Sequence, residues 1–162
     1  PVSKEVFIKN YYLGVGPQSA YTLGLAYNNK HYWFLKMNAN FFDRNFSSVN
    51  PSRRTTDAAE FVSSSDSLYR KIYDQEKLPS YFTIDISGGK SFRLNKIIPK
   101  VGYGTMVYFN FGMSNVLNNR NIISSGFEQL RYDFTNNNPD KFPNKYIYGL
   151  GRTFFVNLSL KF

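Results

Sequence analysis

The chain has 162 residues, enough for one ordinary domain, with 19% aromatic side chains and a formal net charge of +9. Cysteine is absent, which excludes disulfide frameworks, cysteine-ligated metals and thiol nucleophiles. Mean hydropathy is negative and no stretch approaches about 18 consecutive apolar residues, which excludes a helical membrane protein but leaves a β-barrel possible. The basic residues are scattered and no nucleic-acid motif accompanies them, so a basic rim beside anionic lipid phosphates fits better than nucleic-acid binding.

Five segments alternate apolar and polar side chains with the period of two that is typical of β-strands. In chain order they are residues 21–28, 33–42, 82–87, 107–114 and 153–162, and residues 1–17 before them are expected to form an external loop. Charged side chains in mid-strand would be costly against lipid and acceptable in a wet lumen. The residues predicted to face a lumen are Lys36, Asn38, Asn40 and Asp85.

Short and long connections alternate between these segments. Asn29-Lys30 and residues 95–100 make short connections, whereas residues 45–79 and 117–150 make long ones. An up-and-down meander has this pattern, and in outer-membrane barrels the tight turns face the periplasm and the long loops face outside. Two structureless loops of about thirty residues would be unusual in a compact soluble domain.

The sequence therefore predicts an all-β fold: a transmembrane antiparallel up-and-down β-barrel to which this chain supplies about the last five strands. Five strands cannot close such a barrel, because the smallest need about eight, and hydrocarbon does not tolerate open sheet edges. Either several copies of the chain close a barrel together, or residues 1–162 are the C-terminal part of a larger barrel. We expect the second, which the start Pro-Val-Ser without Met favours. Amphipathic rings belong at the membrane–water interfaces, and the predicted interface aromatics are Tyr32, Trp33, Phe41 and Phe92.

The last strand carries a pattern with a known counterpart. Its apolar face consists of Phe154, Val156, Leu158, Leu160 and the final Phe162. This resembles the C-terminal strand of bacterial outer-membrane barrels, whose terminal aromatic residue is an assembly signal for the barrel-assembly machinery.

Several further strings, in a fairly specific order and spacing, carry a resemblance that covers about residues 17–162. They are Pro17–Leu25, Lys30–Phe34, Asn50–Thr55, Gln75–Pro79, Ser114–Asn121, Ser125–Asp133, Asp140–Tyr146 and Gly151–Phe155. Together they resemble the C-terminal end of TonB-dependent outer-membrane receptors, particularly a SusC/Oar-like branch. The sequence departs from that family at Asn118, where an acidic residue is common.

The resemblance implies a barrel of about 22 strands closed by a plug domain, importing a scarce nutrient across the outer membrane of a Gram-negative bacterium. Expected partners are the rest of the barrel and its plug, the TonB complex, the barrel-assembly machinery, and outer-membrane lipid with lipopolysaccharide. A surface lipoprotein is left open. The C-terminus would be periplasmic, and the plug and the segment that contacts TonB would lie upstream.

No catalytic, metal or cofactor site is expected, so the chain is not predicted to be an enzyme. The single His31 has no metal-ligand spacing to another ligand, and the oxygens of residues 136–140 fit a solvated turn better than a calcium site. Gly88-Gly89 indicates a bulge or a close approach of the plug.

Ligand contacts, if present, are expected from cationic and aromatic side chains of the long loops. The candidates are Arg53, Arg54, Tyr69, Phe127, Arg131 and Tyr132. The alternative for these residues is that they pack the loops together or touch lipopolysaccharide. Two other functions stay open: a passive outer-membrane barrel such as a porin or adhesin scaffold, and a soluble β-sandwich binding module.

Overall fold

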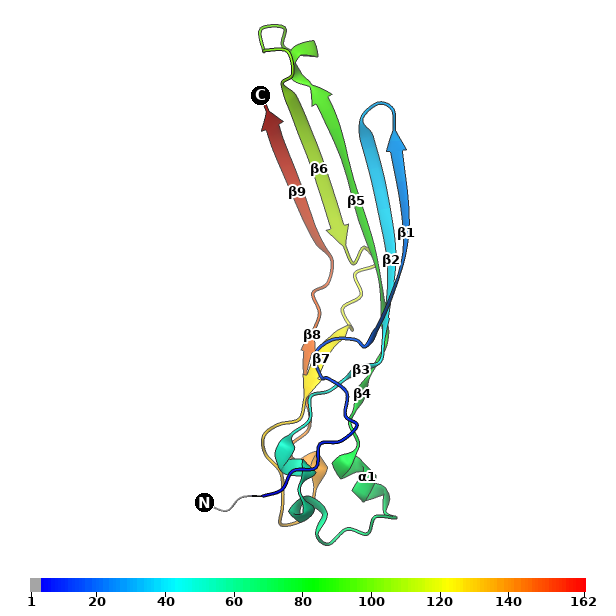
Figure 1. Cartoon of the computed structure of the whole chain (residues 1–162), viewed down its shortest axis with the longest axis vertical. Helices are drawn as coiled ribbons and strands as arrows, with labels where there is room; N and C mark the ends of the chain where they lie inside the picture. Colours follow the sequence, from blue (N-terminus) through cyan, green and yellow to red (C-terminus); the bar gives the residue numbers. More distant parts are fainter. Residues whose placement is uncertain (1–3) are drawn as a thin grey trace. The chain divides into compact units, whose positions relative to one another are not determined.

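The computed structural model describes residues 4–162, which divide into two compact units (Figure 1). Unit 1 comprises residues up to Ser19 together with Phe42–Ser80 and Asn121–Gly149. Unit 2 comprises Ala20–Phe41, Tyr81–Arg120 and Leu150–Phe162. Among the described residues no helix is both long and apolar enough to cross a membrane.

Unit 2 is one five-stranded sheet in the order β1-β2-β5-β6-β9. Its strands are β1 (Ser19–Asn29), β2 (Trp33–Asp43), β5 (Tyr81–Arg93), β6 (Met106–Ser114) and β9 (Thr153–Lys161). All five predicted strands are present, and the prediction of an all-β, antiparallel fold is confirmed. The sheet is open: among residues 4–162, β1 and β9 form its two edges and no closed barrel is present.

The pairing register of β5, β6 and β9 assigns each side chain to one of two faces. Ile86 pairs with Met113 and Met113 with Phe154, whereas Ser87 pairs with Gly112 and Gly112 with Phe155. The second row explains Phe155, the one large residue on the otherwise small and polar side of the last strand. A Cβ atom on Gly112 would lie 2.2 Å from Cε1 of Phe155, so the glycine makes room for that ring.

Gly88 and Gly89 do not form a bulge. The β5–β6 register runs without a shift through both residues, so this part of the sequence-based interpretation is wrong. The ring of Phe111 lies over Gly88, while Phe34 and Asn110 crowd the position of a side chain at Gly89. The close approach at these glycines therefore comes from side chains of the same sheet.

The short connections lie at one end of the sheet (Figure 1). At the β1–β2 turn, the Tyr32 amide donates to the Asn29 carbonyl (3.1 Å), and Tyr32 has a left-handed φ of 63°. The β5–β6 connection is longer than the six residues expected, because the 3₁₀ helix η3 (Leu94–Lys96) and a turn extend it to Thr105.

Unit 1 is made from the two long connections and the N-terminal segment, which were predicted as loops. It contains β3 (Asn45–Phe46), β4 (Lys77–Leu78), β7 (Ile123–Phe127) and β8 (Lys145–Tyr148), with the helices η1 (Pro51–Arg54), η2 (Thr56–Ala59), α1 (Ser67–Tyr73) and η4 (Pro139–Lys141). β3 pairs with β4 and β7 with β8. Backbone hydrogen bonds from Ser48 to Gly126 and from Glu128 to Ser48 join the two pairs.

A small apolar core is formed between the helices η2 and α1 of unit 1. Ala58, Ala59 and Ile72 are buried in it. The helix α1 begins where the Asp66 carboxylate accepts from the Leu68 amide (2.9 Å), a side-chain cap that satisfies one of the free donors at a helix start. The long connections are thus folded segments with a core of their own.

Candidate functional site

One face of the sheet in unit 2, called here the apolar face, exposes large apolar side chains from every strand. Leu23 on one edge strand is 72% exposed and Leu158 on the other is 70% exposed. The exposed members are Tyr21, Leu23, Leu25, Tyr27, Trp33, Leu35, Met37, Phe41, Phe82, Phe92, Phe109, Phe111, Phe154, Val156, Leu158 and Leu160. Contiguous apolar surfaces of this kind mark a contact with another protein or with a membrane.

The opposite face carries a row of polar side chains that are hydrogen-bonded across three strands. Thr22 Oγ1 donates to Asn40 Oδ1 (2.9 Å), and Asn40 Nδ2 donates to Thr83 Oγ1 (3.3 Å) and Asp85 Oδ2 (2.8 Å). The Asn115 amide donates to Asp85 Oδ1 (2.9 Å). We call Thr22, Asn40, Thr83 and Asp85 the polar row.

Two of the four residues predicted to face a lumen, Asn40 and Asp85, are therefore brought into direct contact. The other two, Lys36 and Asn38, are on the same face by the alternation of β2, and Asn38 Oδ1 lies 2.8 Å from where a Cβ atom of Gly24 would be. The Asn115 amide was missed by sequence reasoning, because a backbone donor in a turn leaves no side-chain signal.

Of the predicted interface aromatics, Tyr32, Trp33 and Phe41 lie at the two ends of the β1–β2 hairpin, and Phe92 lies near the end of β5. Trp33 packs against Tyr27 with ring centroids 5.1 Å apart, and Phe41 lies 6.4 Å from Tyr21 at the other end. At the turn, Arg93 Nη2 donates to Tyr32 Oη (3.1 Å). The Lys90 ammonium lies 5.3 Å from the centroid of the Phe92 ring.

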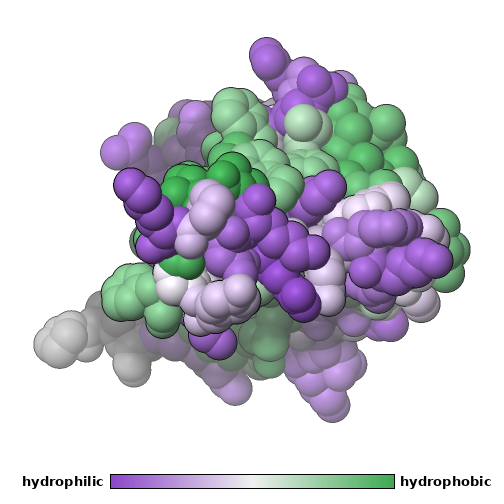
Figure 2. Space-filling view, turned by 90° about the horizontal axis from the view of Figure 1, so that it is seen from above, coloured by the Kyte–Doolittle hydropathy of each residue, from purple (hydrophilic) through white to green (hydrophobic). Residues whose placement is uncertain are grey.

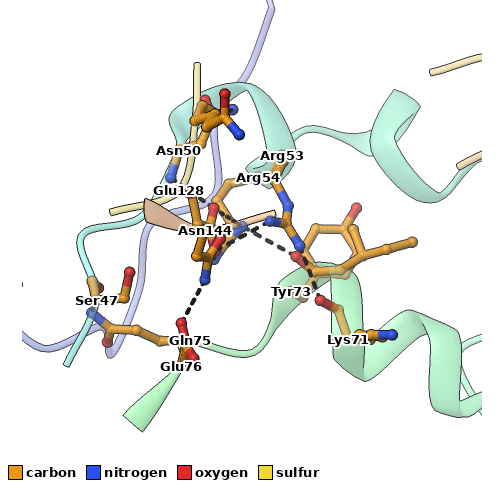
Figure 3. Close-up of polar contacts among 12 residues, drawn as sticks. Ser47, Asn50, Arg53, Arg54, Lys71, Tyr73, Gln75, Glu76, Glu128 and Asn144 are labelled. Atoms are coloured by element: carbon orange, nitrogen blue, oxygen red, sulfur yellow. Dashed lines mark hydrogen bonds and ion pairs between the residues drawn. The ribbon is translucent and has the colours of Figure 1, made fainter. Parts of the chain in front are cut away.

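The centre of unit 1 is a buried ion pair between Arg54 and Glu128 (Figure 3). Arg54 Nη2 donates to Glu128 Oε1 (2.8 Å) and Nη1 donates to Oε2 (3.1 Å), which is the two-point geometry that arginine and carboxylate prefer. Nη1 also donates to the Ile72 carbonyl (3.1 Å), and the Asn50 amide donates to Glu128 Oε2 (2.8 Å). The Tyr11 ring centroid lies 4.9 Å from Cζ of Arg54. This centre joins the N-terminal segment and both long connections.

A second buried cation lies beside this pair. Arg53 Nη2 donates to the Lys71 carbonyl (3.0 Å), and Nη1 lies 3.7 Å from Glu128 Oε1. Burial lowers the pKa of the Arg53 guanidinium, although the Glu128 carboxylate opposes this shift. Two arginines therefore share one buried carboxylate. Burial also raises the pKa of Tyr132, whose ring lies near Arg53, to about 12.

Next to this centre lies a cleft of about 360 Å³ lined by Arg53, Lys71, Glu76, Asp140, Asn144 and Tyr146, among others. Glu76 accepts hydrogen bonds from Asn144 Nδ2 (2.7 Å) and from Tyr146 Oη (2.7 Å). The hydrogen bond to the Glu76 carboxylate raises the pKa of Tyr146 to about 12, with burial adding to the shift. Lys71 and Asp140 form an ion pair at the surface.

The six candidate ligand contacts fall into two groups. Arg53 and Arg54 are buried in the ion-pair centre, Tyr69 packs against Tyr73 (4.7 Å between centroids), and Tyr132 Oη donates to the Ala58 carbonyl (2.8 Å). These four pack the connections together, which is the alternative that the sequence left open. Phe127 and Arg131 stay exposed.

Sequence reasoning missed Glu128, the residue that organises unit 1. It lies within the string Ser125–Asp133 that carries part of the family resemblance, but nothing in the local sequence separates a buried acid from an exposed one. The adjacent arginines Arg53-Arg54 were the only available signal for a buried carboxylate.

The remaining predicted sites lie as follows. Phe154, Val156, Leu158 and Leu160 point to the apolar face of β9, and Phe162 follows the strand and is almost fully exposed. In the turn at residues 136–140, Asn138 Oδ1 accepts from the Asp140 amide (2.9 Å) and caps η4. Across residues 4–162, no group of three or more His, Asp or Glu side chains could hold a metal ion.

Comparison with known proteins finds no family model, no curated protein and no solved structure that matches this chain.

Replacing Glu128 by Gln should destabilise unit 1 by about 3–5 kcal/mol, because two buried guanidinium groups would lose their shared carboxylate. Native-state hydrogen exchange of the amides in η1, measured on the full-length protein, gives the free energy of local opening. The matched control is Asp140→Asn, which removes a carboxylate from an exposed ion pair and should change little. Equal exchange in the two variants would contradict a central role for Glu128.

Unit 1 should also lose stability between about pH 10 and pH 12. The pKa of the Tyr146 hydroxyl is raised in the folded protein, so the unfolded chain loses the hydroxyl proton at a lower pH than the folded chain does. The hydrogen bond from Tyr146 to Glu76 therefore stabilises unit 1 fully below about pH 10, and this contribution is lost toward pH 12. In the Tyr146→Phe variant, the stability of unit 1 should fall less steeply as the pH rises. The measurement is the hydrogen-exchange protection of the β8 amides as a function of pH. Tyr148→Phe, at an exposed ring of the same strand, should keep the wild-type slope; a Tyr146→Phe slope equal to wild type would refute the assignment.

Proposed function

We propose that this chain forms part of the wall and the external loops of a TonB-dependent outer-membrane receptor that imports a scarce nutrient. In this proposal unit 2 spans the outer membrane of a Gram-negative bacterium and unit 1 belongs to the extracellular loops. The C-terminus is periplasmic, and the rest of the barrel, the plug and the TonB complex are partners. The single observation that carries the membrane assignment is the exposed apolar face.

The two faces of the sheet support a membrane wall. Hydrocarbon stabilises exposed apolar side chains by about 25 cal/mol for each Å² removed from water, and the apolar face offers such side chains on all five strands. Lys90 of β5 is a cation on the apolar face, and its ammonium is directed at the Phe92 ring near the end of the strand. A long cationic side chain near a membrane is expected to reach toward the interface in this way. The polar row on the other face suits a water-filled or plug-filled interior.

Unit 1 supports a receptor in preference to a passive pore. Its connections are held by a buried ion-pair centre and a small core, so they present fixed surfaces, including the cleft beside Arg53 and Glu76. Binding loops that are ordered before the ligand arrives lose less conformational entropy on binding. Active import, the plug and TonB enter this proposal from the sequence resemblance alone.

The membrane assignment can be tested with fluorophores on adjacent strand positions. The chain has no cysteine, so Leu25→Cys and Leu158→Cys would report on the apolar face, and their neighbours Ala26→Cys and Asn157→Cys on the opposite face. With bimane attached to the full-length protein in vesicles, phospholipids brominated in the acyl chains should quench positions 25 and 158 and spare 26 and 157. Aqueous iodide quenching all four positions, with no effect of brominated lipid, would support the soluble binding module and defeat the proposal.

Conductance separates the receptor from its passive alternative. The purified full-length protein, inserted into a planar bilayer, should give no sustained ionic current, because a plug fills the barrel. A stable open channel would identify a porin-like barrel. That result would agree with the membrane wall and would contradict the import function.

A further inference from the structure

The positive charge of this chain is concentrated in the sheet. Unit 2 contains a single acidic residue, Asp85, against nine basic ones: Lys30, Lys36, Lys90, Arg93, Lys96, Lys100, Arg120, Arg152 and Lys161. Eight of the nine surplus charges of the chain therefore belong to unit 2. Unit 1 is nearly balanced, with eleven basic and ten acidic residues.

Most of these cations lie at one end of the sheet. Lys30 is in the β1–β2 turn, Arg93, Lys96 and Lys100 are at the end of β5 and in the connection to β6, and Lys161 ends β9. The register places Lys161 and Arg93 on either side of Met106, and the Ser91 amide donates to the Tyr32 carbonyl (2.9 Å), so these segments are neighbours. With Lys90, whose ammonium points toward Phe92, six cations form what we call the hairpin end.

The hairpin end also exposes apolar and aromatic groups. Ile97 is 65% exposed and Tyr103 is 99% exposed. Seen from above, this end shows hydrophilic residues lying against hydrophobic ones (Figure 2). The one acidic residue of the sheet, Asp85, is occupied in the polar row with Asn40 and Asn115. Its carboxylate therefore does not neutralise the cations of the hairpin end.

A cleft of about 310 Å³ opens within this end of the sheet. Its lining combines the cations Arg93 and Lys96 with the apolar side chains of Phe92 and Ile97, together with Tyr32 and Ser91. A guanidinium and an ammonium that line one cleft suit a phosphate group, and the apolar part of the lining suits the hydrocarbon attached to it.

We propose that the hairpin end binds anionic phospholipid of the leaflet that it meets, with the headgroup phosphate in the cleft between Arg93 and Lys96. This inference rests on the proposed membrane function, since it places the turns of the sheet at a lipid–water interface. Each Lys or Arg near an anionic membrane surface raises the binding constant for that surface by about fivefold. A soluble polyanion would use the cations but leave the neighbouring Phe92, Ile97 and Tyr103 without a partner, so lipid fits the whole surface better.

The test uses a fluorophore at Tyr103→Cys, an exposed turn position, on the full-length protein in phosphatidylcholine vesicles. Brominated phosphatidylglycerol and brominated phosphatidylcholine are compared at equal mole fraction and low salt. We expect phosphatidylglycerol to have a relative binding constant higher by about fivefold or more. High salt should reduce this preference, because it screens exposed charges.

Charge removal makes the test specific. The triple variant Arg93→Gln, Lys96→Gln, Lys100→Gln should lose the preference, and the milder pair Lys96→Gln, Lys100→Gln should lose part of it. The matched control Lys9→Gln, Arg131→Gln, Lys145→Gln removes three exposed cations from unit 1 and should keep it.

The outcomes are distinguishable. Equal quenching by both lipids, a preference that survives the triple variant, or one abolished by inorganic phosphate at the same concentration as the lipid would overturn the inference while leaving the membrane wall intact. Quenching by neither lipid would instead reject the membrane function on which it rests.

Discussion

Antiparallel pairing in one continuous register separates the apolar face of unit 2 from its polar face. Because side chains alternate between faces, a shift of one residue would exchange the apolar and polar faces of a strand. The ladder from Ile86 through Met113 to Phe154, and its neighbour from Ser87 through Gly112 to Phe155, keep the faces separate over three strands. Gly88, Gly89 and Gly112 permit this register because larger residues there would collide with the rings packed over them.

In unit 1, polar contacts hold the chain segments together more than apolar packing does. Few apolar side chains are buried among its described residues: Ala58, Ala59 and Ile72 form one cluster, and Leu78 and Ile122 are buried apart from it. The segments are joined mainly by polar contacts around Glu128. A buried ion pair adds little net stability compared with apolar packing, but its partners must meet in one geometry. The contacts of Arg54 with Glu128 and Ile72 therefore select one arrangement of three chain segments that have little regular secondary structure.

The surplus positive charge and the large exposed apolar surface both belong to unit 2. Unit 1 is nearly neutral and several of its charged groups form ion pairs with one another, whereas unit 2 carries almost the entire surplus of positive charge. Most cations of unit 2 lie at the turns, and the middle of the apolar face carries aliphatic and aromatic side chains. This division is what the proposed membrane wall requires, because a bilayer is apolar inside and anionic at its surface.

Strand positions were predictable from the sequence because alternation is a local property. The five strands and the shared face of Asn40 and Asp85 follow from a period of two within short windows, and the tight turn at Asn29 follows from the Asn29-Lys30 connection between two such windows. The family resemblance extended this to a proposed function, which neither a family model nor a similar structure tests. The bulge expected at Gly88-Gly89 was wrong, since only the neighbouring strands could reveal that Phe34, Asn110 and Phe111 fill the space beside these glycines.

Folding of the long connections was decided by tertiary structure alone. Residues 45–79 and 117–150 lack the periodicity of strands or helices, and their order comes from contacts between residues such as Arg54 and Glu128, which lie 74 positions apart. A charged side chain looks the same in sequence whether it is solvated or buried, so Arg54 could be predicted as a ligand contact but not as the centre of a core. Local alternation is thus enough to identify the strands and the face that each side chain occupies. Which charges are buried and which stay exposed at the turns depends on partners from distant segments, and these meet only in the folded chain.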